Sequence, residues 1–196
     1  MYDRFTEDRA AIGARISKET GATLVPPFDH PWIIAGQGTT ALELLEEVPD
    51  LDAIVVPIGG GGLMSGCSIA AKAMDPRIRV IGVEPATAND AALSLASGER
   101  VEIPPPDTIA DGLRVPQLGP LTYSIIRENV ERVVLVTDDE IRATVKWLLM
   151  RAKILVEPSG AATAAAVMFR KLPPELSRVG VILSGGNVDF EVLAGF

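Results

Sequence analysis

Four consecutive glycines, Gly59–Gly62, follow a short apolar run and precede a stretch with the pattern of a helix. Because glycine has no Cβ atom, several backbone N–H groups can converge there on one anion. The N-terminus of the following helix would add its partial positive charge. The run therefore predicts a site for a phosphate group, and for a single monoester better than for a pyrophosphate. A tight, closely packed turn from strand to helix is the alternative.

Two common nucleotide sites do not fit this run. A P-loop requires a Gly-Lys-Ser/Thr sequence after its glycines, and no such sequence follows Gly62. A dinucleotide-binding loop has the spacing Gly-x-Gly-x-x-Gly and an acidic residue about 20 positions later. Glu84 lies near that distance, but the glycine spacing differs. A nucleotide-binding module is therefore disfavoured.

The elements that must position the glycines alternate along the chain. The capping box of Thr137 and Glu140 opens one helix, while Thr6 and Gly21 bound the first. Strands are expected at 22–25, 53–58, 78–83, 133–136 and 179–183, and helices at about 7–20, 33–47, 63–74, 86–97, 121–129, 138–153 and 158–170. This alternation predicts an α/β fold, with a mostly parallel sheet between two layers of helices. Ligands of such sheets bind at the carboxyl ends of the strands, where both glycine clusters, 59–62 and 185–186, are expected.

Composition excludes several partners. The chain has 196 residues, 47% of them hydrophobic, and a net charge of −8. It has no basic stripe for nucleic acid or an anionic membrane surface. No apolar run reaches the roughly 18 residues of a membrane span. Cys67 is the single cysteine, so no intramolecular disulfide is possible, and a reducing cytoplasm is expected.

Six motifs give the chain a specific resemblance. In their order, the motifs resemble the serine/threonine dehydratase and serine racemase family of pyridoxal-phosphate (PLP) enzymes, which has the fold of the tryptophan synthase β subunit (fold type II). The match spans nearly the whole chain and corresponds to the C-terminal part of the family. The motifs are Ile34-Ala35-Gly36-Gln37-Gly38-Thr39, Val56-Pro57-Ile58-Gly59-Gly60-Gly61-Gly62-Leu63, Val83-Glu84-Pro85, Thr108-Ile109-Ala110-Asp111-Gly112, Val156-Glu157-Pro158-Ser159-Gly160 and Leu183-Ser184-Gly185-Gly186-Asn187.

The resemblance implies a set of cofactor-binding residues. The backbone of Gly59, Gly60, Gly61, Gly62 and Leu63 would bind the PLP phosphate. Gly112 would approach the cofactor ring, and the Ser184 hydroxyl would meet the pyridine nitrogen. A hydroxyl suits an unprotonated nitrogen, and the resulting ring suits elimination better than transamination. Alternatively, Ser184 only caps a Gly-Gly turn.

Two further roles are implied by the same resemblance. Some members of the family hold a divalent cation near the active site, and Glu84, the Ala88 carbonyl and Asp90 match that ligand pattern. Oxygen ligands favour Mg²⁺, Ca²⁺ or Mn²⁺. Asp90 could instead cap a helix or face solvent. Glu157 matches a glutamate near the cofactor, or is a buried carboxylate at the start of a helix.

The chain departs from the family at one essential group. The family uses a lysine that forms a Schiff base with PLP, in a Ser-Phe-Lys type motif. The five lysines, none of them in that context, are Lys18, Lys72, Lys146, Lys153 and Lys171. Without that lysine there is no evident base for the α-proton. We expect residues 1–30 to be a remnant of the small domain and 31–196 to form the large, phosphate-binding domain.

The expected function follows from both points. The chain is predicted to be a fragment of a PLP-dependent threonine/serine dehydratase, an ammonia-lyase that is inactive without the missing lysine. Alternatives are a non-catalytic phosphate- or PLP-binding regulatory module, or part of a serine racemase. Apolar surface left by the missing part predicts a homo-oligomer, such as a dimer.

Overall fold

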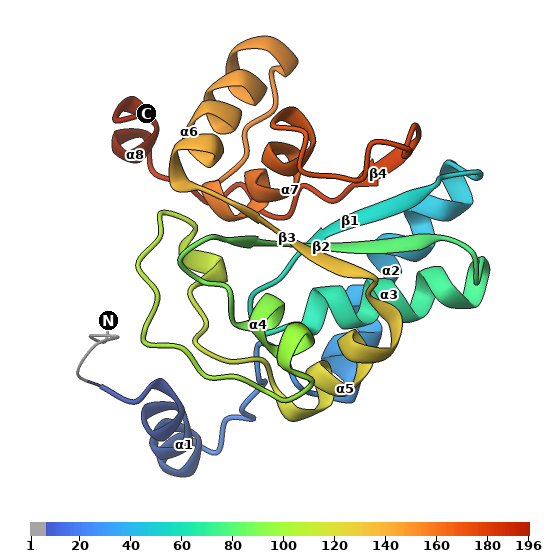
Figure 1. Ribbon diagram of the computed structural model, residues 1–196. Helices are drawn as coiled ribbons and strands as arrows, with labels where there is room; N and C mark the ends of the chain where they lie inside the picture. Colours follow the sequence, from blue (N-terminus) through green and yellow to red (C-terminus); the bar gives the residue numbers. More distant parts are fainter. Residues whose placement is uncertain (1–6) are drawn as a thin grey trace.

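Residues 7–196 are described in a computed structural model (Figure 1), and its centre is a four-stranded parallel sheet. The strands are β1 (Ala53–Pro57), β2 (Arg79–Pro85), β3 (Arg132–Val136) and β4 (Val179–Val181), in the order β3-β2-β1-β4. In the register, Val55 of β1 lies opposite Ile81 of β2 and Val181 of β4. The chain thus extends the sheet in one direction from β1 to β3 and then returns to the other side of β1.

Helices cover both faces of the sheet, so the predicted three-layer α/β fold is confirmed. Figure 1 shows one group of helices below the sheet and another above it. The lower group is α2 (Pro31–Glu47), α3 (Gly62–Met74), α4 (Asp90–Ser97) and α5 (Pro120–Asn129). The upper group is α6 (Asp138–Trp147), the π-helical turn η2 (Leu148–Ala152), α7 (Pro158–Met168) and α8 (Phe190–Ala194). A 3₁₀ turn, η1 (Asp111–Leu113), lies in the long connection between α4 and α5.

Strand β1 joins two hydrophobic cores because its side chains alternate between the faces. Ile54 and Val56 belong to the core with α2, α3 and α5, whereas Val55 belongs to the core with α6 and α7. All five residues of β1 are buried. An unbroken apolar run is the pattern of such a doubly covered parallel strand, as the sequence predicted.

A close crossing of α2 and α3 fixes the start of α3 on the sheet. Gly38 and Gly66 face each other at this crossing, and a Cβ atom on Gly66 would overlap the Ile34 carbonyl oxygen. Both helices therefore approach at backbone distance. This contact places the residue before Gly38, which is Gln37, beside the glycine run that precedes α3.

Three expectations about elements are corrected or left untested by the structure. No strand forms at 22–25, where Leu24 and Val25 are 56% and 65% exposed and the described chain offers no neighbouring strand. Helix α1 (Arg9–Thr20) begins after Asp8, whose carboxylate accepts the N–H of Ala10 at 2.8 Å. The proposed cap Thr6 lies outside the described residues.

Helix α4 also starts later than expected, at Asp90 instead of residue 86. The reason is that β2 runs to Pro85 and a turn follows it, in which the Ala86 N–H donates to the Val136 carbonyl at 2.8 Å and the Ala88 N–H to the Pro85 carbonyl at 2.9 Å. In residues 7–196 no helix is long and apolar enough to cross a membrane. Helix α1 lies apart from both cores and has no buried residue. The division into 1–30 and 31–196 stays a prediction.

The α2–α3 crossing makes a prediction for stability. Gly66→Ala should lower the free energy of unfolding by about 2 kcal/mol, because the new methyl meets rigid backbone. Gly36→Ala on α2 is the matched control, since its Cβ meets nothing within 4 Å. The control should gain up to about 1 kcal/mol from helix propensity. Chemical denaturation measures both; equal stability of the two variants would contradict the close crossing.

Candidate phosphate-binding site

The glycine run and the second glycine cluster meet at the carboxyl ends of β1 and β4. These adjacent strands lie where the chain reverses its direction through the sheet, which is the usual position for a ligand crevice. A cavity of about 240 Å³ opens there. It is lined by Arg9, Pro27, Phe28, Gln37, Pro57, Gly59, Gly60, Gly61, Gly62, Leu63, Gly112, Leu113, Val115, Glu157, Ser159 and Ser184. All seven residues predicted to contact the cofactor are in this set.

The floor of the cavity presents a run of unpaired backbone N–H groups. Within the described chain, the N–H groups of residues 59–64 form no hydrogen bond, and the next one in the chain, of Ser65, donates to the Gly61 carbonyl at 2.8 Å. Gly60, Gly61 and Gly62 are buried. A buried N–H without an acceptor costs about 1–3 kcal/mol, so most such groups in proteins are paired. The arrangement fits an anionic ligand with several acceptor oxygens, as a phosphate monoester has.

Packing also explains why these positions are glycines. A Cβ atom on Gly60 would overlap the Phe28 ring, and one on Gly62 would overlap the Gln37 carboxamide. Gly61 has a φ of 89°, and its Cβ would lie 2.8 Å from Ile126. The tight turn and the phosphate site are therefore both consistent with glycine. The unpaired N–H groups, not the glycines themselves, favour the phosphate site.

Phe28 and Gln37 belong to the site, although sequence reasoning did not select them as ligand-binding residues. Phe28 lies in the connector before α2, and its ring packs against Gly60. The Gln37 Oε1 atom is buried beside Gly62 without a hydrogen-bond partner in the described chain. Exchanging the oxygen and nitrogen of this carboxamide would place its NH₂ donor at the same point. The signal for Gln37 in the sequence is its place in the family motif Ile34–Thr39, with a glycine on each side.

Ser184 lines the same cavity as the glycine run and lies on the segment that follows β4. Its hydroxyl forms no hydrogen bond with residues 7–196 and is free to meet a ligand. Glu157, the residue before α7, holds the same segment: its carboxylate accepts the Asn187 N–H at 2.8 Å. Its own N–H donates to the Gly185 carbonyl at 3.3 Å. Glu157 is thus the predicted carboxylate at a helix start, but it is partly exposed and borders the cavity.

Gly112 closes the cavity from the 3₁₀ turn η1. Its carbonyl lies 3.0 Å from the position that a Cβ on Gly59 would take, and its N–H donates to Ser159 Oγ at 2.9 Å. This contact ties η1 to the first turn of α7. Gly112 and Gly59 therefore border the cavity from two separate connections.

The three proposed cation ligands lie together between β2 and α4. Glu84 is fully buried, and its carboxylate accepts the N–H groups of Ala91 and Ala92 at 3.0 and 2.9 Å. Asp90 is also buried, and its Oδ2 has no hydrogen-bond partner among the described residues. Burial raises the pKa of Glu84 to about 8, helped by the charge of Asp90, and raises the pKa of Asp90 to about 7. No group of three or more His, Cys, Asp or Glu residues in positions 7–196 could hold a metal, so a cation site at Glu84, Ala88 and Asp90 stays a prediction.

None of the five lysines lines the cavity. Lys72 donates to the Pro76 and Ile78 carbonyls, Lys153 to the Met150 carbonyl, and Lys171 pairs with Glu140 at 2.8 Å.

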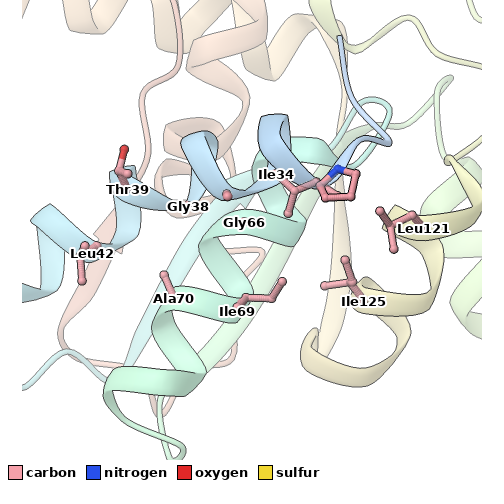
Figure 2. A pocket seen from close by; sticks show the side chains of 11 residues that line it. Ile34, Gly38, Thr39, Leu42, Gly66, Ile69, Ala70, Leu121 and Ile125 are labelled. Atoms are coloured by element: carbon pink, nitrogen blue, oxygen red, sulfur yellow. The ribbon is translucent and has the colours of Figure 1, made fainter. Parts of the chain in front are cut away.

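A larger cavity, of about 380 Å³, lies between the outer sides of α2, α3 and α5 (Figure 2). Apolar side chains such as Ile34, Ile69 and Ile125 line it, and it contains no titratable side chain. In contrast to this apolar cavity, the cavity at the ends of β1 and β4 contains polar and charged side chains, such as Arg9, Glu157 and Ser184.

Comparison with known proteins identifies close relatives. The family model "Pyridoxal-phosphate dependent enzyme" matches residues 2–185. The chain is 48% identical over 190 residues to L-threo-3-hydroxyaspartate ammonia-lyase of Saccharomyces cerevisiae, covering 97% of this chain and 58% of the relative. It is 46% identical over 196 residues to serine racemase of Schizosaccharomyces pombe, covering 100% of this chain and 61% of the relative. The structure of maize serine racemase matches with a TM-score of 0.88 and 45% identity, over 95% of this chain and 60% of that one. The chain thus spans about six tenths of the length of these proteins.

The two buried carboxyls make a prediction about pH. Both pKa values are raised in the folded state, so the folded chain binds more protons than the unfolded chain between the unfolded pKa values near 4 and the folded values of about 7 and 8. The free energy of unfolding contributed by these groups should therefore fall as the pH rises from 4 to 8, and stay constant above that.

Glu84→Gln tests this sign. The free energy of unfolding of the wild type minus that of Glu84→Gln, measured by urea denaturation, should decrease by a few kcal/mol between pH 5 and pH 8. Glu102→Gln, at an exposed position, should leave the pH dependence as it is in the wild type. A difference that is constant with pH, or of opposite sign, would show that Glu84 is not held protonated.

Proposed function

Because the chain belongs to the family of pyridoxal-phosphate dependent enzymes, we propose that it is the cofactor-phosphate-binding part of an ammonia-lyase for β-hydroxy-α-amino acids. The resemblance that the sequence motifs indicated is confirmed at the level of this family. The proposed reaction of the whole enzyme is elimination of water from serine or threonine, followed by hydrolysis of the released enamine, which gives pyruvate or 2-oxobutyrate and ammonia. The hydroxyaspartate and serine named for its relatives share the β-hydroxyl group that such an elimination needs.

The observation that carries the proposal is the run of unpaired N–H groups at residues 59–64. We propose that those of Gly59 to Leu63 donate to the phosphate of PLP, and that the N-terminal end of α3 adds its favourable partial charge. PLP, when bound, supplies an electron-withdrawing ring and aldehyde that ease the breaking of bonds at the Cα atom of an amino acid. At the phosphate end of the cofactor, the chain would hold the phosphate and thereby orient the ring.

Ser184 and Glu157 would set the other end of the cofactor. The free hydroxyl of Ser184 can donate to an unprotonated pyridine nitrogen, which keeps the ring neutral. Glu157 holds the segment of Ser184 in place through the Asn187 N–H and the Gly185 carbonyl. A Cβ atom on Gly112 would lie 3.0 Å from Ser159 Oγ, so the missing side chain allows η1 to pack closely on the start of α7 at the border of the cavity. In this proposal, these residues take the roles that the family's motifs imply for them.

A proton acceptor for the Cα–H bond must come from elsewhere in the whole enzyme. No lysine borders the cavity in the described chain, and the relatives are longer by about four tenths of their length. Elimination by the whole enzyme therefore requires a lysine outside these 196 residues. If no such lysine joins it, the chain would serve as a phosphate- or PLP-binding module without catalysis. A serine racemase is the third possibility, since it would use the same anchor.

Two further parts of the proposal concern ions and assembly. We propose that Mg²⁺, Ca²⁺ or Mn²⁺ binds at Glu84, the Ala88 carbonyl and Asp90, because a cation would neutralise two buried carboxylates there. We also propose that the chain associates with itself or with the rest of the enzyme. Trp147, Met150 and Leu155 are 48%, 56% and 53% exposed and lie together in sequence around η2. Covering such apolar side chains would favour assembly.

Equilibrium binding and covalent trapping test the proposed function together. The chain should bind PLP, with a lower affinity for pyridoxal, which lacks the phosphate. Borohydride should trap no cofactor on any of the five lysines, and L-serine and L-threonine should give no pyruvate or 2-oxobutyrate.

Two results would count against the proposal. Equal affinity for PLP and pyridoxal would contradict phosphate anchoring. Trapping at one of the five lysines, together with turnover of serine, would contradict the need for an external lysine.

A further inference from the structure

We propose that the Thr122 hydroxyl is a positioning group for the phosphate site, because it fixes the orientation of the peptide that joins Gly60 and Gly61. The inference rests on the proposed function, since it concerns the same site. Thr122 lies on α5, outside the cavity, and no motif of the sequence selected it. Its side chain is fully buried against the back of the glycine run.

The contact is a hydrogen bond to the loop's backbone. Thr122 Oγ1 donates to the Gly60 carbonyl, with 2.8 Å between the two oxygens. The Gly119 carbonyl lies 3.1 Å from the same hydroxyl, but Gly119 is the residue just before α5 and not part of the glycine run. A Cβ on Gly61 would lie 2.9 Å from both Thr122 Cβ and Thr122 Oγ1. Thr122 therefore touches the loop at the point where its backbone takes the left-handed conformation, with φ of 89° at Gly61.

The geometry of a trans peptide makes this contact relevant to the ligand. In a trans peptide the C=O of one residue and the N–H of the next point in opposite directions. A donor that holds the Gly60 carbonyl toward α5 therefore turns the Gly61 N–H away from α5, toward the side bordered by the cavity. Glycine has broad conformational freedom, so without this bond the Gly60–Gly61 peptide could rotate. Thr122 thus orders one of the unpaired N–H groups in advance of binding.

Helix α5 is itself held in place by the connector before α2. The Asp29 Oδ1 atom accepts the N–H groups of Leu121 and Thr122 at 2.8 and 3.0 Å. Asp29 adopts a left-handed backbone conformation, with φ of 53°, that brings its carboxylate to the N-terminus of α5. Gly119, the residue before α5, provides no side-chain cap of its own, and a Cβ there would overlap Asp29. Asp29 therefore fixes the first turn of α5, which carries Thr122.

The connector and the loop form one unit in this way. Phe28 packs on Gly60 from the cavity side, while the adjacent Asp29 holds the helix that contacts Gly60 from behind. The Gly60–Gly61 peptide is thus held between two neighbouring residues of one connector, directly by Phe28 and through α5 by Asp29. This arrangement gives the residues just before α2 a role in phosphate binding.

Isosteric substitution separates the hydroxyl from the shape of the side chain. Thr122→Val removes the hydroxyl and keeps the volume, whereas Thr122→Ser keeps the hydroxyl. Thr144→Val is the matched control: Thr144 is equally buried, and its hydroxyl donates to the Glu140 carbonyl at 2.7 Å on α6, on the other face of the sheet. All three variants and the wild type are titrated with PLP and with pyridoxal, and their thermal unfolding is recorded.

We expect Thr122→Val to lose affinity for PLP by about tenfold, the effect of one net hydrogen bond, while its affinity for pyridoxal stays unchanged. Thr122→Ser should restore the affinity for PLP. Thr144→Val should bind PLP as the wild type does, even where its unfolding temperature falls by as much as that of Thr122→Val. An unchanged PLP affinity in Thr122→Val, or an equal loss for PLP and pyridoxal, would overturn the inference.

A second measurement needs no ligand and separates this inference from the proposed function. If the wild type binds neither PLP nor pyridoxal, the proposed function fails. The NMR signal and hydrogen exchange of the Gly61 amide then decide the positioning role. Both should change in Thr122→Val and remain as in the wild type in Thr122→Ser. A Gly61 amide that is the same in all variants would show that Thr122 does not orient this peptide.

Discussion

The site depends on a row of backbone N–H groups, from Gly59 to Met64, that have no hydrogen-bond acceptor in the described chain. These groups follow directly after the buried strand β1. Protein interiors rarely leave such groups unpaired, because each loses its hydrogen bonds to water without replacement. The described residues around the loop provide no acceptor for these N–H groups and pack against the loop in its present conformation. Phe28 and Gln37 contact Gly60 and Gly62, while Thr122 and Ile126 contact Gly61, so the loop is packed closely by its neighbours. The missing acceptors are most simply supplied by a ligand, and the match to pyridoxal-phosphate dependent enzymes points to a phosphate.

The order of the strands in the parallel sheet places these N–H groups beside a cavity. β1 and β4 are neighbours, so the segments after them, with the glycine run and Ser184, border one cavity. The two cores on either face of β1 fix the strand from both sides, and the Gly38–Gly66 crossing fixes the start of α3. A phosphate anchor needs this rigidity, because it must hold the ring of the cofactor at a set distance from the groups that act on it. In the proposed function the chain provides position, and proton transfer at the substrate would depend on a lysine outside these 196 residues.

Local patterns in the sequence predicted most of the fold, and they selected the glycine run that borders the cavity. The apolar run at 53–58 indicated a doubly covered strand, and the Thr137–Glu140 capping box is present at α6. Ser184 and Gly112 were selected only through the family motifs, and both border the cavity. Local patterns could not predict contacts between residues that are far apart in the sequence. The Asp29 carboxylate binds the first turn of α5, more than 90 positions away, and no local pattern indicates Thr122 as its partner. The expected strand at 22–25 failed for a related reason, because a strand requires a neighbour, and propensity alone does not supply one.

The most direct test is a crystal structure of this chain grown with excess PLP. We predict phosphate oxygens within hydrogen-bond distance of the backbone nitrogens of Gly59 to Leu63, with Ser184 Oγ beside the pyridine nitrogen. The loop should also keep its conformation, since the N–H groups are already in place. A phosphate bound elsewhere, or a cavity filled by Phe28 with the loop N–H groups paired to the chain itself, would contradict the assignment of this loop as the phosphate anchor.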